Sequence, residues 1–331
     1  MKAQYLGPPL VSVLVPAFNH QEYIKCCLDS IAESSYVPLE ILVIDDGSSD
    51  ATYARACAWM DDNAHRVKRV TVCRQANQGI TRTLNALISL ARGEYIALLG
   101  SDDVLESDGI ALRVSALQRH PGWLAVFGDC SVIDGVGQLQ SVSVLDSMYH
   151  ACIPALLNPR RIARELILRW SVAGPSLLVR RTAYDVDIGV GLYDERLQVE
   201  DRDFYLRLLS INGLGFIHAT VARYRLHGEN SIFSRGSNVT NDVVSAEWRN
   251  ATSFRGLNRW LLTLVAVRGS VQLCAVRQKE QGNIIRGQIL WFVGRILAVI
   301  QKCAHVLHRL LSLDPLARLT AAARRNGRSP F

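Results

Sequence analysis

Short apolar runs without polar alternation recur along the first third of the chain, and a polar turn follows each of them. Such runs predict strands that are buried on both faces of a sheet. We predict strands at residues 11–15, 39–44, 67–73 and 95–99, with helices at 22–32, 51–60 and 81–91. Alternation of strands and helices with short connections is typical of a mostly parallel, doubly wound sheet.

Two of these strands lead into paired carboxylates. The strand at 95–99 runs through a Gly-Ser pair to Asp102-Asp103, and the strand at 39–44 leads directly to Asp45-Asp46. Carboxyl ends of parallel strands meet at one edge of the sheet, where open α/β folds bind ligands. Adjacent carboxylates are costly unless donors or a cation satisfy them, and hard divalent cations prefer oxygen ligands. Capping of the next helix by Asp102 is the alternative.

The composition narrows the class of protein. The net charge is +7, and the basic excess lies in the C-terminal third, which suggests membrane lipid or nucleic acid as a partner. No helix-turn-helix pattern or aromatic RNA-binding signature occurs, so nucleic acid is not expected. The eight cysteines lack C-x-x-C and metal-finger spacing and are expected to be reduced thiols. The N-terminus does not read as a signal peptide, which favours the cytosolic side.

The C-terminal third has helical spacing over residues 255–276 and 283–313, with Arg and Lys interspersed among many apolar positions. No uninterrupted apolar run approaches membrane-spanning length, whereas a basic amphipathic helix can lie in a membrane interface. A helical hairpin packed on the rest of the chain, or an oligomer contact, is the alternative. The tail adds positive charge that anionic lipid would attract, at Arg318, Arg324, Arg325 and Arg328.

Two common nucleotide-binding motifs are absent. The first strand-to-helix turn carries Pro16 and Asn19 where a dinucleotide fold of the usual type has G-x-G-x-x-G. No G-x-x-x-x-G-K-[ST] occurs, which excludes an ATPase of the P-loop kind.

Five segments in order resemble a known family: VSVLVPAFN, ILVIDDGSSD, NQGITRTLNAL, GEYIALLGSDD and VEDRDFYLRL. They resemble the inverting glycosyltransferases of family 2, over roughly Leu10 to Ser231. The resemblance implies a GT-A fold, which is an α/β, doubly wound, mostly parallel and Rossmann-like sheet. It implies a catalytic domain at 1–240 (nucleotide-binding half about 10–130, acceptor half about 131–240) and a basic amphipathic helical extension at 241–331.

The resemblance also assigns a nucleotide-sugar site. A carboxylate equivalent to Asp46 accepts a hydrogen bond from the base, which suits a group that only accepts. An Asp-rich turn with a helix cap is the other interpretation of this pair. Arg82 and Asn85, which follow the turn at Gly79, are placed to reach the nucleotide, and an exposed helix face is the alternative for both. The implied contacts are Pro16, Ala17, Phe18, Asn19, Asp45, Asp46, Gly79, Arg82, Ser101, Asp102 and Asp103.

Residues 100–103 match the family's metal-binding D-x-D region with one departure, because Gly100 stands where the first aspartate is often found. The resemblance leaves Asp102 as the direct ligand of Mg²⁺ or Mn²⁺, with His227 as a second ligand or a phosphate contact. Metal use is still expected, since Mg²⁺ needs few protein ligands. Asp103 either contacts sugar hydroxyls or caps the next helix. A structural role is the alternative for His227.

Glu200-Asp201 resembles the pair that supplies the general base in this family. An inverting transfer needs one carboxylate to take the proton of the acceptor hydroxyl as it attacks. Asp201 is expected to be the base, kept ionised by the dipole of the helix that it begins, and Glu200 to support it. A helix cap followed by solvated acidic residues is the alternative. Another D-x-D string, at Asp185 and Asp187, is expected to be a solvated turn.

The expected activity is sugar transfer from a nucleoside diphosphate-sugar to a hydroxyl of a glycan or lipid-linked acceptor, in cell-surface polysaccharide or lipid-linked glycan synthesis. The expected location is cytoplasmic, at the inner face of the cell membrane. A nucleotidyltransferase would carry a Gly-rich basic loop after the first strand, which this chain lacks. A third possibility is a non-catalytic relative that binds a sugar or a partner. Gly100 is the only sequence feature that favours it, whereas the presence of Glu200-Asp201 argues against it.

Overall fold

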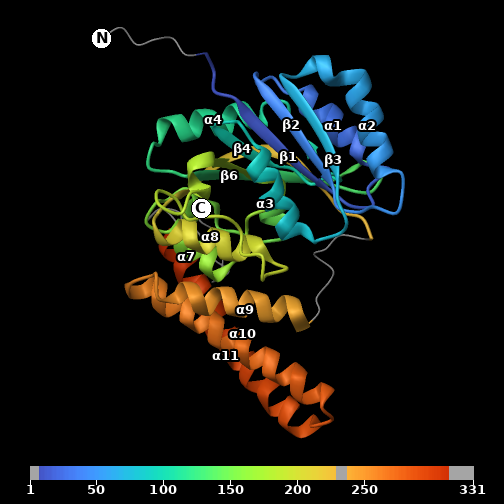
Figure 1. Ribbon diagram of the computed structural model, residues 1–331. Helices are drawn as coiled ribbons and strands as arrows, with labels where there is room; N and C mark the ends of the chain where they lie inside the picture. The colour runs from blue at the N-terminus through green and yellow to red at the C-terminus, as the bar shows by residue number, and fades with distance from the viewer. Residues whose placement is uncertain (1–6, 229–236, 313–331) are drawn as a thin grey trace, which may run out of the picture.

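One mixed sheet forms the centre of the protein in the computed structural model, which describes residues 7–228 and 237–312 (Figure 1). The strands lie in the order β3-β2-β1-β4-β8-β6-β9-β5, and β7 pairs with β6. Their bounds are β1 Val11–Ala17, β2 Leu39–Asp45, β3 Arg69–Arg74, β4 Tyr95–Leu98, β5 Val104–Leu105, β6 Ala125–Ile133, β7 Leu139–Ser141, β8 Leu177–Arg180 and β9 Leu214–Arg225. The α-helices are α1 Ile24–Ala32, α2 Thr52–Asn63, α3 Ile80–Leu90, α4 Gly109–Arg119, α5 Val144–Ser147, α6 Ile153–Leu156, α7 Ile162–Leu168, α8 Glu200–Ser210, α9 Ser237–Ala251, α10 Gly256–Glu280 and α11 Ile284–Ser312.

The first half of the sheet is parallel, as the sequence predicts. β1 pairs in parallel with β2 and β4, and β2 pairs in parallel with β3. Successive residues of β1 pack into different cores: Val13 lies with Leu28 of α1, and Leu14 lies with Leu87 of α3. Both β1 residues are fully buried. Because helices cover both faces, these strands need no polar alternation.

The second half of the sheet contains β6 and β9, which the apolar pattern does not predict. They pair in parallel with each other, whereas β8 pairs antiparallel with both β4 and β6. β6 is buried along its whole length although it includes Asp129 and Ser131. The sheet is therefore mixed, and its parallel half consists of β1 to β4. This is the GT-A-like fold with C-terminal helices that the resemblance implies.

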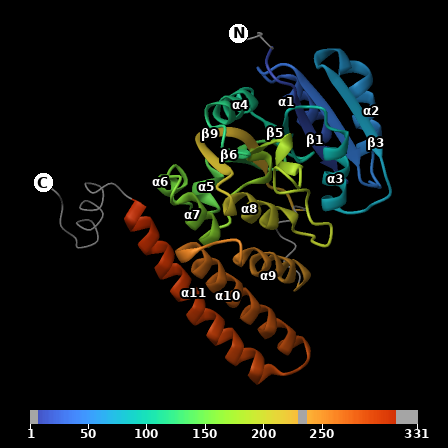
Figure 2. The same cartoon turned by 60° about the vertical axis from the view of Figure 1, so that its left-hand side comes forward.

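The C-terminal helices pack beside the sheet-containing part, and the α10–α11 hairpin extends away from it (Figures 1 and 2). The predicted helices at 255–276 and 283–313 are confirmed as α10 and α11. α9 begins before residue 240 and packs on α8 and α10. Within the described residues, two helices are long and apolar enough to cross a membrane, at residues 256–279 and 284–311. Isolated arginines and lysines interrupt their apolar runs, as the sequence shows.

Candidate active site

The loops after β1 and β2 are tied together at the carboxyl edge of the sheet. The backbone N–H of Asp46 donates to the carbonyl of Ala17 at 2.8 Å. Asn19 adopts a positive φ of 53°, and its side-chain oxygen accepts from the N–H of Ser49 at 2.9 Å. Its own N–H donates to Ser48 Oγ. Phe18 is left 45% exposed at this edge, where a flat ligand can stack on it.

The Asp46 carboxylate holds the loop that begins α3. Its Oδ1 accepts from Gln75 Nε2 at 2.8 Å and from the N–H of Gln78 at 2.9 Å, and its Oδ2 accepts from the N–H of Gly79 at 2.9 Å. Gly79 has a φ of +86°, a conformation that favours glycine. Each carboxylate oxygen has two lone pairs, so these bonds leave acceptor capacity on Oδ2.

Asp45 and Arg82 are less well placed than Asp46 to contact a nucleotide. Asp45 is fully buried, where Oδ2 accepts from the N–H of Ser48 and lies 3.2 Å from Arg74 Nε. This is the Asp-rich turn that the sequence offers as one interpretation. Arg82 is exposed and lies 3.5 Å from Glu195, on the helix face given as its alternative.

The buried Asn85 binds the segment that leads into α8. Its amide nitrogen donates to the carbonyl of Tyr193 at 3.0 Å, and its oxygen accepts from the N–H of Tyr193. Thr81 Oγ1 donates to the carbonyl of Leu197 at 2.7 Å. α3 therefore positions the chain just before Glu200 and Asp201.

The second carboxylate pair, Asp102 and Asp103, lies after β4, and its two side chains have different surroundings. Asp103 is buried, and its Oδ1 accepts from the backbone N–H of Arg225 at 2.9 Å. Burial and the neighbouring charge of Asp102 raise the pKa of Asp103 well above its ordinary value. The Arg225 side chain donates to the carbonyls of Asp102, at 2.7 Å, and Asp134, at 3.0 Å. Asp103 and Arg225 thus join β9 to the loop after β4.

Asp102, by contrast, points into a cluster with two imidazoles. Its Oδ2 lies 3.0 Å from His227 Nε2, and its Oδ1 lies 3.8 Å from His20 Nδ1. One ligand atom from each of the three residues lies within 4.8 Å of the others, and no second group of this kind occurs among the described residues. One carboxylate and two imidazoles are donors that divalent metal ions accept in proteins, so the residues present fit a metal ion.

The Glu200-Asp201 pair begins α8, as expected. Both side chains are half-buried, and Asp201 Oδ1 accepts from the N–H of Arg202 at 2.7 Å. Burial raises the pKa of Asp201, while the hydrogen bond and charge of Arg202 and a hydrogen bond from Trp170 oppose the rise. Burial and the charge of Asp201 raise the pKa of Glu200. Such a pair retains a proton at higher pH than free carboxylates do. The expectation that the helix dipole keeps Asp201 ionised is therefore not met, because burial outweighs the stabilising interactions.

Burial is the main cause that raises the pKa of Tyr149, and the charges of Asp201 on α8 and Asp103 after β4 add to the rise. Sequence reasoning missed Tyr149 and Trp170, because the segments that carry them match none of the five motifs.

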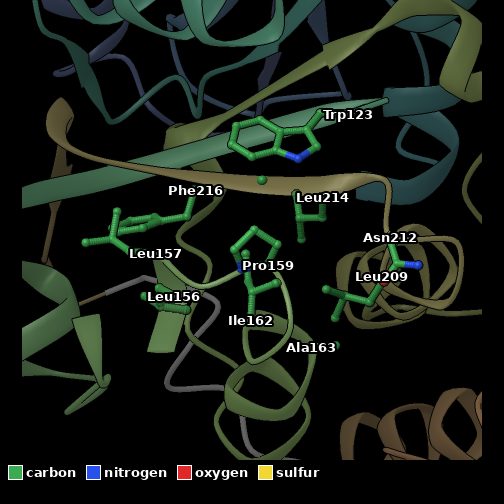
Figure 3. A pocket seen from close by; sticks show the side chains of 11 residues that line it. Trp123, Leu156, Leu157, Pro159, Ile162, Ala163, Leu209, Asn212, Leu214 and Phe216 are labelled. Atoms are coloured by element: carbon green, nitrogen blue, oxygen red, sulfur yellow. The ribbon is translucent and has the colours of Figure 1, made fainter. Parts of the chain in front are cut away.

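An apolar pocket elsewhere in the protein does not belong to this site (Figure 3). Trp123, Leu157, Ile162 and Phe216 are among the side chains that line it, and none of its lining residues is a predicted site residue. The ring of Trp123 lies so close to Gly215 that a Cβ there would be 2.1 Å from it. The pocket is a packing feature of β9.

Comparison with a family model identifies the family. Residues 12–184, which are more than half of the chain, match the family model described as glycosyl transferase family 2. The chain belongs to glycosyltransferase family 2. A chondroitin synthase of Escherichia coli is 28% identical over 224 residues, which cover 67% of this chain and 30% of that protein. A hyaluronan synthase of Pasteurella multocida is 27% identical and is covered over 21% of its length. The chain thus spans less than a third of these two relatives.

Solved structures support the same fold. Residues 1–349 of TarS from S. aureus, in complex with UDP-GlcNAc, align with a TM-score of 0.57 and 17% identity, covering 97% of this chain and 93% of that one. A mannosyltransferase from Pyrobaculum calidifontis, in complex with GDP-Man and Mn²⁺, aligns with a TM-score of 0.56 and 18% identity, over 97% and 88% of the two chains.

Several of the predicted positions are now located. Asp185 and Asp187 form an exposed turn, as expected. Residues 229–231 of the matching stretch, and the tail arginines from 318 onward, lie outside the described residues. The roles expected for Asp46, Asp102, Asp201 and His227 stay predictions.

Proposed function

We propose that this family 2 glycosyltransferase transfers a sugar from a nucleoside diphosphate-sugar to a hydroxyl acceptor with inversion at the anomeric carbon. The observation that carries the proposal is the presence of two acidic sites in a chain of this family: a carboxylate pair at the first turn of α8, and the Asp102 cluster with His20 and His227 after β4. An inverting transfer requires a base on one side of the reacting carbon and charge stabilisation for the leaving group on the other.

Asp201 is the proposed base. It accepts the proton of the acceptor hydroxyl while that oxygen forms a bond to the anomeric carbon. The bond from that carbon to the diphosphate oxygen breaks on the opposite side, and its electron pair leaves with the nucleoside diphosphate. Arg202, which donates its N–H to Asp201, and Trp170 hold the carboxylate in place. Glu200 supports the pair and orients the acceptor.

Asp102 and His227 are the proposed ligands of a divalent metal ion, Mg²⁺ or Mn²⁺. When bound, such an ion neutralises negative charge on the leaving diphosphate. The nucleotide is proposed to lie over the ends of β1 and β2, with Asp46 as acceptor for the base and Phe18 packing against it. Bound UDP-GlcNAc and GDP-Man in the structural neighbours support a nucleotide-sugar donor. The chondroitin and hyaluronan synthases support a growing polysaccharide as the acceptor class.

Asp102→Asn is expected to remove the metal-dependent part of nucleoside diphosphate binding. In a thermal-shift assay with UDP and GDP, a ligand that binds only the native state stabilises it by about 2.7 kcal/mol at 100 times its Kd. That stabilisation should require Mn²⁺ or Mg²⁺ in the native chain and should be lost in the variant. Asp62→Asn, on the exposed side of α2, is the control. Metal-dependent stabilisation that persists in Asp102→Asn would contradict the assignment.

A second part of the proposal concerns the outer face of α11, which we propose contacts the membrane surface. Large apolar side chains line this face at helical spacing, and each is about half or more exposed: Ile285, Ile289, Phe292, Ile296, Val299 and Leu307. Arg295, Lys302 and Arg309 follow one flank at seven-residue intervals and are exposed. Apolar residues bordered by basic ones suit the interface of an anionic membrane.

The inner face of α11 has the opposite character. Buried positions on this face carry small or polar side chains: Gly287, Gly294, Gln301, His305 and His308. A Cβ on Gly287 would lie 2.7 Å from Lys279 Cγ of α10, so the glycine permits close helix packing. A helix that packs its small and polar residues inward and leaves its apolar residues outside is adapted to an apolar surrounding.

Phe292→Glu combined with Ile296→Glu is expected to weaken binding to phosphatidylglycerol vesicles by more than about tenfold. Burying each apolar side chain contributes roughly 1.5–3 kcal/mol, and the added negative charge opposes the lipid. Vesicle co-sedimentation measures the change, with Val136→Glu, in the turn after β6, as the control. Equal sedimentation of both variants and the native chain would favour the packed hairpin or an oligomer contact.

A further inference from the structure

His20 stands at the start of the segment between β1 and α1, in a position that none of the five motifs assigns. Its Nδ1 lies 2.8 Å from Ser101 Oγ and 3.8 Å from Asp102 Oδ1. Its backbone N–H donates to Thr52 Oγ1 at 2.8 Å, which fixes the residue on α2. The imidazole therefore reaches Asp102 from the segment after β1, whereas His227 reaches it from the segment after β9.

Aromatic packing orients both imidazoles. The rings of His20 and His227 meet edge to face, with centroids 5.5 Å apart. Tyr23 lies against both of them, at 5.9 Å from His20 and 5.0 Å from His227. The guanidinium of Arg225 lies over the ring of Tyr23, 5.0 Å from its centroid. Ligand side chains that are held in advance by packing need little reordering when they bind an ion.

Gly100 leaves the metal site without the first carboxylate of a D-x-D motif, so a third ligand has to come from another residue. A Cβ at residue 100 would lie 2.7 Å from Asp102 Oδ1 and 2.9 Å from Asp103 Oδ2. A side chain there would require one of the two carboxylates to move, and with glycine at this position the chain supplies no carboxylate from it. A donor set with Asp102 and His227 alone has two protein ligands, and His20 supplies the third.

We propose that His20 is a direct ligand of the metal ion, in place of the carboxylate absent at Gly100, and that the site consequently selects Mn²⁺ over Mg²⁺. The inference rests on the proposed function, because it concerns the same ion. Mg²⁺ prefers oxygen ligands, whereas imidazole nitrogen favours the transition ions. Two imidazoles and one carboxylate therefore move the preference of the site toward Mn²⁺.

The test measures metal binding to the purified full chain without turnover. Mn²⁺ titrations followed by electron paramagnetic resonance give the affinity, and pulsed measurements of bound Mn²⁺ count the directly bound nitrogens. The native chain should show two nitrogens and bind Mn²⁺ more tightly than Mg²⁺. His20→Asn should show one and lose about tenfold or more in Mn²⁺ affinity, since even outer-shell changes cost about 10–100-fold. Its Mg²⁺ affinity should change less.

His65→Asn, on an exposed turn after α2, is the matched control and should bind Mn²⁺ as the native chain does. Unfolding of each variant without metal checks that the fold is kept, and His20→Gln provides a second replacement. One bound nitrogen in the native chain, or native Mn²⁺ affinity in His20→Asn, would overturn the assignment of His20. Failure of the proposed function has a different signature, because the native chain would then bind no nucleoside diphosphate.

Discussion

Asp201→Asn is expected to lower donor-sugar turnover by about 10²- to 10⁴-fold, the usual contribution of a positioned general base. An amide keeps the size of the side chain and can still accept from the N–H of Arg202, but it cannot take a proton at neutral pH. Binding of the nucleoside diphosphate should stay close to native, because the residues proposed to contact the nucleotide and the metal ion lie after β1, β2, β4 and β9. Turnover assays and calorimetric binding measure the two effects separately.

The pH profile of the native enzyme gives an independent readout of the same residue. The base works only when it is deprotonated, so kcat/KM should fall as the pH drops through the pKa of Asp201. Burial raises that pKa, so the acid limb should lie above the value of about 3.9 for a free aspartate. Asp187→Asn, in an exposed turn, should keep native turnover. Substantial turnover by Asp201→Asn would remove Asp201 as the base.

Glu247→Leu is expected to destabilise the protein by about 3–5 kcal/mol, because it leaves the Arg202 charge buried without its partner. Glu247 on α9 and Arg202 on α8 are 3.0 Å apart, and both side chains are only 4% exposed. Arg202 also donates to the carbonyls of Leu166 and Ile167 at the end of α7. The pair therefore joins α7, α8 and α9 directly behind Asp201. Urea unfolding, followed by tryptophan fluorescence, measures the change in unfolding free energy.

An exposed ion pair provides the comparison. Arg223 and Glu106 are 2.8 Å apart, with side chains 47% and 30% exposed. Exposed pairs contribute about 0–1 kcal/mol, so Glu106→Leu should change the unfolding free energy little. Equal effects of the two leucine substitutions would show that the buried pair does not hold α9 on the catalytic part.

The sequence predicts the parallel half of the sheet well, because strands that are buried on both faces leave unbroken apolar runs. β2 and β4 begin at the predicted residues, Leu39 and Tyr95. β6 and β9 leave no such signal: β6 buries Asp129 and Ser131 among its apolar residues, and β9 mixes buried, half-buried and exposed positions without a regular period. Pairing of β9 with β6 is a tertiary choice that local pattern does not encode.

The same division applies to the candidate site. Asp46 and Asp102 are found from sequence because each directly follows a recognisable strand. His20 is missed because a single histidine in a loop carries no signal until the fold brings it to Asp102, 82 positions later in the sequence. The helix predicted at residues 283–313 is confirmed as α11, but only the structure shows that glycines and polar residues occupy its packed face.

The most direct test of the proposed function is a thermal-shift panel of UDP, GDP, dTDP and CMP on the native chain, each with and without Mn²⁺. We predict that one nucleoside diphosphate stabilises the protein and that this effect requires the metal ion. The identity of that nucleotide would define the donor class. Stabilisation by none of them, with or without Mn²⁺, would contradict transfer from a nucleoside diphosphate-sugar at this site.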